Sequence, residues 1–222
     1  MKHRRLTFGV MGVLATLSAL GGCNIVAPAV ILASGPPKRD AVYVLPEDRP
    51  TLVFVDDRDN RLPRRSLRMA ISDSAQDLLM RSGTVKPEHM IDAKVIATVT
   101  SRESATQPMD IQTIARQAQA QIVIYVVPAS FRLSSDGQTY DPAADFYIKV
   151  LDVTQDKPRL WPEEAQGKAI PIRLTTRASE VPSRAADLVQ AEDKLAAECG
   201  RVIAELFHRH EIRGRVSEGR PE

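Results

Sequence analysis

Cysteine and histidine are scarce in this chain of 222 residues, which contains two cysteines and four histidines. Cys23 and Cys199 could form at most one disulfide, so a disulfide-rich scaffold is excluded. His208 and His210 are two residues apart and cannot share one face of a helix, and the other two histidines lie far from them in the sequence. This distribution argues against a zinc site.

The sequence signatures of common catalytic sites are also missing. There is no glycine-rich phosphate loop, no Gly-x-Ser-x-Gly nucleophile elbow and no histidine pair at metal-binding spacing. The charge balance carries no nucleic-acid signature, because 28 Asp and Glu nearly offset 30 Lys and Arg. We therefore expect no cofactor and no nucleic-acid partner.

The clearest positive feature is an apolar stretch close to the first residue. Lys2, Arg4 and Arg5 precede an uncharged segment at residues 6–20, and small residues then lead to Cys23. This three-part layout is typical of a secretory signal. As a helix the segment would rise only about 22 Å, which is too short for a hydrocarbon core of about 30 Å. A permanent transmembrane helix is therefore the weaker interpretation.

Leu20, Gly21, Gly22 and Cys23 resemble the lipobox of bacterial lipoproteins, where the signal peptidase cleaves before a lipid-modified cysteine. A cysteine thiolate is a nucleophile that can take up a lipid, and several acyl chains together anchor a protein stably. The resemblance implies that Cys23 carries lipid such as palmitate and holds the protein at a membrane. An ordinary signal, or an uncleaved anchor over residues 6–32, is the alternative.

Cleavage before Cys23 would alter both the charge and the expected location. The first 22 residues hold three of the basic residues and none of the acidic ones, so the remaining chain has a formal charge of −1. Asn24 follows the cysteine. An Asp at that position resembles a signal for inner-membrane retention in proteobacteria, so its absence favours, by analogy, an outer-membrane lipoprotein that faces the periplasm.

Composition divides the chain into four parts. Residues 1–22 are expected as the signal peptide, and residues 23–50 as the lipidated cysteine and a proline-rich tether. Residues 51–212 are expected to form a single globular domain, followed by a flexible tail at residues 213–222. Inside the tether, residues 41–45 have the composition of a short edge strand.

Hydrophobic spacing predicts the elements of the globular part. Compact β-rich runs predict strands at residues 51–55, 93–99, 121–127, 146–153, 160–161 and 170–174. Helical spacing predicts helices at residues 64–81, at residues 111–118 with Asp110 as N-cap, and at residues 183–210. This order predicts an α/β (α+β) fold, with a mixed sheet of about five strands, two to three covering helices and a long C-terminal helix.

Three single residues carry local predictions. Residues 121–127 are the most apolar run outside the signal and are expected to be a central strand, which Pro128 ends or kinks. Pro171 places its strand at an edge of the sheet, because proline cannot donate to a ladder. Cys199 lies on the apolar stripe of the last helix, so we expect a buried thiol.

The middle of the chain, about residues 51–161, resembles a group of small envelope domains. The matching segments are the first strand and helix, the step from residues 114–120 into the strand at 121–125, and the hairpin at 150–161. The group comprises domains of the curli-secretion lipoprotein, the lipoprotein activator of penicillin-binding proteins and the amino-terminal domain of the Tol-system propeller protein. Gln121 replaces an Asp that the group usually carries. The resemblance implies an envelope accessory protein acting through protein contacts.

Asp56, Asp57 and Asp59 are the best candidates for a catalytic or metal site. They follow the first strand, and ligands often bind beyond the carboxyl ends of strands in open α/β sheets. Clustered carboxylates also bind hard cations. The alternative is a solvated turn in which Arg58 and nearby arginines balance the charge. We favour that turn, so a lipid-anchored hydrolase or divalent-cation-binding protein remains the second functional hypothesis, and no catalytic residue is assigned.

Trp161 is the only tryptophan of the chain. A tryptophan near a sheet edge can anchor a partner protein, as in many interface hot spots. It can equally be the core residue of its own hairpin, which is the interpretation we favour. A partner contact at Trp161 is therefore a secondary hypothesis.

Overall fold

The computed structural model describes residues 37–100, 108–176 and 181–212. The predicted signal peptide, Cys23, most of the tether and the tail at residues 213–222 lie outside these residues. The described chain falls into two compact units, one of which contains Asp40–Arg209. In the other unit, β1 (Lys38–Arg39) pairs antiparallel with β8 (His210–Glu211).

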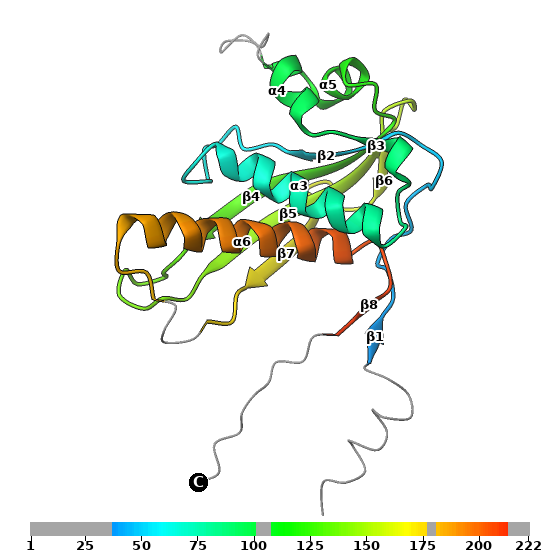
Figure 1. Ribbon diagram of the computed structural model, residues 1–222. Helices are drawn as coiled ribbons and strands as arrows, with labels where there is room; N and C mark the ends of the chain where they lie inside the picture. Colours follow the sequence, from blue (N-terminus) through cyan, green and yellow to red (C-terminus); the bar gives the residue numbers. More distant parts are fainter. Residues whose placement is uncertain (1–36, 101–107, 177–180, 213–222) are drawn as a thin grey trace, which may run out of the picture. The chain divides into compact units, whose positions relative to one another are not determined.

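The larger unit is built on one mixed sheet, which confirms the α/β fold class (Figure 1). Its strands are β2 (Thr51–Val55), β3 (Met90–Ile91), β4 (Ile122–Arg132), β5 (Ala143–Asp152), β6 (Arg159–Trp161) and β7 (Lys168–Arg173). Their order is β3-β2-β4-β5-β6, and β7 also pairs with β5. β2 is parallel to both neighbours, whereas β5 is antiparallel to β4, β6 and β7.

Helices cover both faces of this sheet. α3 (Ser66–Arg81) and the long α6 (Ala185–Glu205) lie together on one face, as Figure 1 shows. α4 (Lys94–Thr100) and α5 (Ile111–Gln117) pack on the other face, and a short 3-10 helix, η1 (Pro87–His89), precedes β3. The helices predicted at residues 64–81, 111–118 and 183–210 are thus present with shorter bounds.

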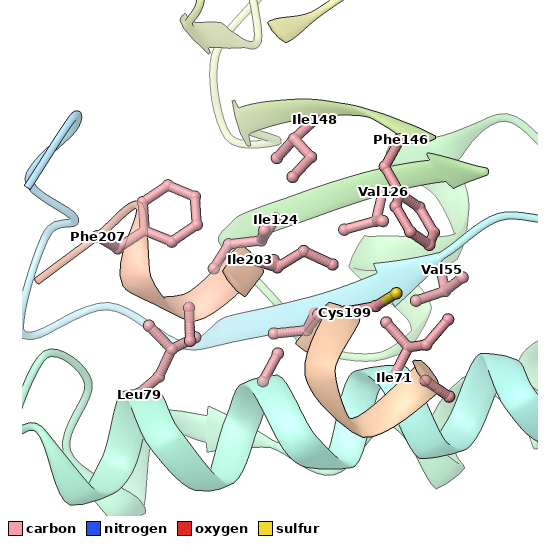
Figure 2. Packing of buried hydrophobic residues seen from close by; sticks show 14 of the residues in the cluster. Val55, Ile71, Leu79, Ile124, Val126, Phe146, Ile148, Cys199, Ile203 and Phe207 are labelled. Atoms are coloured by element: carbon pink, nitrogen blue, oxygen red, sulfur yellow. The ribbon is translucent and has the colours of Figure 1, made fainter. Parts of the chain in front are cut away.

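The main core lies between the sheet and the α3–α6 pair. In Figure 2, Ile124 and Phe146 of the sheet face Ile71 of α3 and Ile203 of α6. All four are buried, and full burial of such a side chain contributes about 1.5–3 kcal/mol. Cys199 is buried in the same cluster, as its place on the apolar stripe predicted. Packing in this core fixes the position of α3 relative to β2.

α3 and α6 approach each other closely at Gly200. A Cβ built on Gly200 would press against the carbonyl oxygen of Ile71 and lie 2.6 Å from Cβ of Ser74. Nearby, the Ser74 hydroxyl donates a 2.7 Å hydrogen bond to the carbonyl of Ala197. Glycine at this position is therefore needed for packing and not for an unusual backbone angle.

The strand predicted at residues 93–99 is wrong, because these residues form most of α4. The Asp92 side chain accepts a 2.8 Å hydrogen bond from the backbone N–H of Lys94 and so starts the helix. Ile96 and Val99, three residues apart on the helix, then face the second core cluster, and Ala93 is also buried. Tertiary packing outweighs the β-propensity of the valines and isoleucine here.

The two prolines confirm their local predictions. β4 continues through Pro128, but its pairing with β5 shifts register between Pro128 and Ser130. The proline therefore kinks the strand and does not end it. β7 pairs with β5 alone, so Pro171 sits in an edge strand.

Compact packing begins earlier than residue 51. Leu45 is only 3% exposed and belongs to the main core, and no strand forms at residues 41–45. The backbone N–H groups of Val42 and Tyr43 donate to the carbonyl of Leu206, at 2.7 and 3.3 Å. The part of the expected tether from Asp40 onward thus packs on the domain.

Candidate functional site

The candidate site lies at the carboxyl end of β2, where the chain changes face. β2 lies between two parallel neighbours, β3 and β4. The connection from β2 to β3 uses α3 on one face, and the connection from β3 to β4 uses α4 and α5 on the other. In open α/β sheets, ligands bind in the crevice at such a topological switch point.

Asp56 is the first residue after β2 and is 8% exposed. Its Oδ2 accepts a 2.6 Å hydrogen bond from the hydroxyl of Tyr125, and its Oδ1 lies 3.4 Å from Nε of Arg58. Arg58 also donates from Nη2 to the carbonyl of Met109 at 2.7 Å. Burial, together with the hydrogen bond to Asp56, raises the pKa of Tyr125. The phenol therefore remains a donor to the carboxylate at neutral pH.

Asp57 shapes the turn that follows. It is 3% exposed, and its carboxylate accepts hydrogen bonds from the backbone N–H groups of Arg61 at 2.6 Å and Leu62 at 3.3 Å. Arg68 of α3 donates from Nη2 to the Asp57 carbonyl at 2.8 Å and lies 3.6 Å from its Oδ2. The carboxylate thus holds the loop against α3, a structural role.

The three predicted aspartates do not form one cluster. Asp56 and Asp57 use their oxygens on separate protein partners, and Asp59 is exposed. Within residues 37–100, 108–176 and 181–212, no group of three or more His, Cys, Asp or Glu is placed to hold a metal ion. The favoured interpretation was a solvated turn whose charges arginines balance. Arg58 and Arg68 do lie beside the aspartates, but Asp56 and Asp57 are buried, so the turn is not solvated at these two residues.

Beside this turn is a cleft of about 470 Å³ between β2, α3 and α4. Three arginines and one aspartate line it, so the lining carries a positive excess of charge. Apolar side chains complete the surface. The lining residues are Val53, Phe54, Val55, Asp56, Arg58, Arg65, Arg68, Met69, Ser72, Ala93, Ile96, Ala97 and Thr100. The volume falls in the range of about 300–1,000 Å³ that is usual for small-ligand sites.

α3 supplies the polar wall of the cleft. Arg65, Arg68 and Ser72 follow one another at intervals of three and four residues, which puts them on one face of the chain as it enters and forms the helix. In the sequence, Arg65 is one of the arginines near the aspartate run, and neither Arg68 nor Ser72 belongs to a motif. Their helical spacing was visible, but α4 opposite them was expected to be a strand.

Two polar groups in this wall have no protein partner. Nε of Arg68 is buried and has no hydrogen-bond acceptor. Ser72 is 3% exposed, and no hydrogen bond joins its hydroxyl to another residue that the structure describes. Buried polar groups are hydrogen-bonded in the great majority of cases, so the Nε of Arg68 calls for an explanation. The Ser72 hydroxyl is not among the fully buried unpartnered atoms of the described residues, and it stays within reach of solvent.

Trp161 lies away from this cleft and packs within its own unit. Its ring centroid is 6.1 Å from that of Tyr43 and 6.2 Å from that of Phe207, and it borders the main core. Trp161 is thus partly buried and packs against residues outside its own hairpin.

No known family model matches this chain, and no curated protein matches it. The solved structures that match include three at low sequence identity, each with a TM-score below 0.5. The PelC dodecamer from Paraburkholderia phytofirmans matches with a TM-score of 0.42 and 13% identity, over 78% of this chain and 97% of that one. The hypothetical protein CT253 from Chlamydia trachomatis matches with a TM-score of 0.38 and 14% identity, over 71% and 89%.

The third structure is the lipoprotein GNA1162 from Neisseria meningitidis, with a TM-score of 0.36 and 16% identity, over 64% of this chain and 90% of that one. Similarity at this level says nothing about what the present chain binds. Separately, none of the helices in the described part of the chain is both long and apolar enough to cross a bilayer.

Proposed function

We propose that this chain is a lipid-anchored accessory protein of the bacterial cell envelope, which faces the periplasm from the outer membrane and acts through protein contacts. The observation that carries the proposal is the lipobox-like Leu20-Gly21-Gly22-Cys23 at the end of an uncharged apolar segment. Acylation of Cys23 would hold the folded unit at a membrane surface, where it meets other envelope proteins. No catalytic role is assigned to the chain.

Exposed apolar side chains support a role in protein contacts. Val181, Leu188 and Val189, before and within the first turns of α6, are 55%, 47% and 43% exposed. Exposed apolar residues that are close in sequence in this way offer apolar area for a partner. Arg64 holds this end of α6 against α3, through Glu192 at 2.5 Å and Asp193 at 2.7 Å.

The geometry of the aspartate loop does not favour the alternative of a hydrolase or divalent-cation-binding protein. Asp56 and Asp57 already satisfy their carboxylates with a phenol, backbone N–H groups and arginines. A cation would have to displace these partners. We therefore keep the accessory role as the proposal.

The anchor is tested by labelling cells with radioactive palmitate. Wild type and Cys199→Ser should incorporate label, and Cys23→Ser should not, because only Cys23 lies in the lipobox-like sequence. Equal labelling of wild type and Cys23→Ser would refute the anchor.

The partner role is tested by crosslinking in intact cells and co-purification. Wild type should recover the same envelope protein reproducibly, and Leu188→Asp together with Val189→Asp should reduce that recovery. Repeated recovery of no envelope protein would count against a role in protein contacts.

A further inference from the structure

The cleft at the end of β2 has features that an accessory protein acting only through surface contacts does not need. Its polar wall is Arg65, Arg68 and Ser72, and its apolar surface comes from Phe54, Met69 and Ile96. The three polar residues share one face, and the apolar residues come from β2, α3 and α4. The polar wall of the cleft can therefore bind a negatively charged group, and the apolar surface can contact the apolar part of the same ligand.

Arg65 is the first cation available to such a ligand. Its guanidinium makes no ion pair or hydrogen bond with another described residue, and its side chain does not cap α3. Arg58 and Arg68, in contrast, each lie beside an aspartate carboxylate. Arg65 is therefore the arginine of the cleft whose positive charge no described carboxylate balances.

Ser72 provides an independent sign of a ligand. Its residue is more than nine-tenths buried, it lines the cleft, and its hydroxyl has no hydrogen bond to a described residue. The unpartnered Nε of Arg68, one turn earlier on the same face, adds a second donor. Leaving a buried polar group unpaired is unfavourable, so an acceptor that reaches the Nε of Arg68 would recover part of the free energy lost there.

We propose that the cleft between β2, α3 and α4 binds a small organic oxyanion, a phosphate or carboxylate group carried on an apolar body. The oxyanion accepts hydrogen bonds from Arg65, Arg68 and Ser72, and guanidinium groups are well suited to both kinds of anion. The apolar body lies against Phe54, Met69 and Ile96. This site goes beyond the accessory role proposed above and does not depend on it.

The test is calorimetric titration of the full-length chain, purified from membranes in a neutral detergent at low ionic strength. Phenyl phosphate and phenylacetate are the two probes, and they distinguish a phosphate ligand from a carboxylate ligand. Saturable binding of at least one is expected, and binding of neither would overturn the proposal. Inorganic phosphate, which lacks the apolar body, should bind about tenfold more weakly than phenyl phosphate. Equal affinity for the two phosphates would overturn the apolar half of the site.

Two variants connect the binding to the polar wall. Arg65→Gln should weaken the affinity for the bound probe about tenfold, because it removes a charge-assisted hydrogen bond. Ser72→Ala should weaken it several-fold. The matched control is Arg61→Gln, which removes the same charge from an exposed residue that does not line the cleft. Unchanged affinity in Arg65→Gln, or an equal loss in Arg61→Gln, would overturn the assignment.

Two further measurements complete the test. Benzyl alcohol, which has the apolar body without the charge, should bind much more weakly than the anionic probes, and equal binding would overturn the oxyanion assignment. The urea midpoints of Arg65→Gln and Ser72→Ala should stay close to that of wild type, which separates lost binding from lost folding. An acidic peptide that binds when both small anions fail would refute the small-ligand assignment.

Discussion

Arg49 donates two hydrogen bonds to the buried carboxylate of Asp152, from Nη1 at 2.5 Å and from Nη2 at 2.8 Å. Asp152 ends β5 and its side chain is 1% exposed, whereas Arg49 lies just before β2. Nε of Arg49 also donates to Gln121 at 2.9 Å. One arginine thus joins the segment before the first strand to the central strands, which explains why compact packing starts before residue 51.

Replacing Arg49 by Ala should lower the free energy of unfolding by about 2 kcal/mol, because it leaves a buried carboxylate without its charged donor. Urea unfolding at neutral pH measures the loss. Arg81→Ala is the matched control, since Arg81 and Asp77 form an ion pair in which both side chains are mostly exposed. A loss in Arg49→Ala no larger than in this control would contradict the structural role.

The same pair predicts a pH dependence. The hydrogen bonds from Arg49 lower the pKa of Asp152 well below its ordinary value of 3.8. A lowered folded-state pKa gives stability that is fully present above the unfolded pKa and is lost as the pH falls toward the folded pKa. The urea midpoint of Asp152→Asn should therefore fall below that of wild type at neutral pH, and the gap should narrow in acid below about pH 4. A gap that is constant with pH would contradict this.

Tyr125→Phe should lower the free energy of unfolding by about 1–2 kcal/mol, because the Asp56 carboxylate loses the phenol that donates to it. Tyr147→Phe is the control, since Tyr147 lies on the neighbouring strand and its hydroxyl makes no hydrogen bond with a described residue. Chemical denaturation of both variants measures the difference. Equal stability of the two would show that the bond to Asp56 contributes nothing.

Calcium and magnesium should not raise the melting temperature of wild type. The carboxylates of Asp56 and Asp57 are engaged with protein donors, and a ligand raises the melting temperature only when it binds the native state. A thermal-shift scan with each cation tests this. A rise in wild type that disappears in the Asp56→Ala, Asp57→Ala double variant would instead support a cation site at this loop.

Gly200→Ala should destabilise the fold by about 1–3 kcal/mol, because the added methyl group would press on the backbone of α3 at Ile71. Helix propensity alone predicts the opposite sign, since alanine favours helices over glycine by about 1 kcal/mol. Gln190→Ala, at an exposed position of α6, should change stability little. Equilibrium unfolding of the two variants gives the comparison, and a stabilised Gly200→Ala would contradict the close helix contact.

The thiol of Cys199 should resist modification in the native protein. It is completely buried, and burial raises its pKa above the ordinary value, so little reactive thiolate forms. In Cys23→Ser, a thiol reagent should leave the folded chain unlabelled and should label one thiol per chain in denaturant. Fast labelling of the folded variant would show that the thiol of Cys199 is accessible to the reagent in the native state.

Several elements were predictable from local pattern. Leu67, Ile71, Ala75 and Leu79 recur at helical spacing, and all four are buried in α3 as that spacing requires. The apolar run at residues 121–127 became the buried start of β4. Asp110 was predicted as an N-cap, and its carboxylate accepts a 2.9 Å hydrogen bond from the N–H of Thr113. Each of these depends on residues that are near one another in the sequence.

The misassigned elements and the overlooked site depended on distant contacts. Residues 93–99 have strand-like composition, but burial against α5 and the sheet makes them a helix. The cleft appears only when α4 stands opposite the polar face of α3. Arg65 and Ser72 could be placed on one face from their spacing, but nothing in the sequence indicates what that face meets.

The sequence by itself supplies the lipobox-like residues on which the proposed anchor rests. It also determined the α/β class and which faces of most helices and strands are buried, because hydrophobic period is a local property of the chain. The tertiary structure alone decided that Arg49 reaches Asp152, that Gly200 lets two helices touch, and that Arg65, Arg68 and Ser72 line a cleft. These outcomes depend on which surfaces meet after the chain folds, and that is set by long-range packing between elements far apart in the sequence.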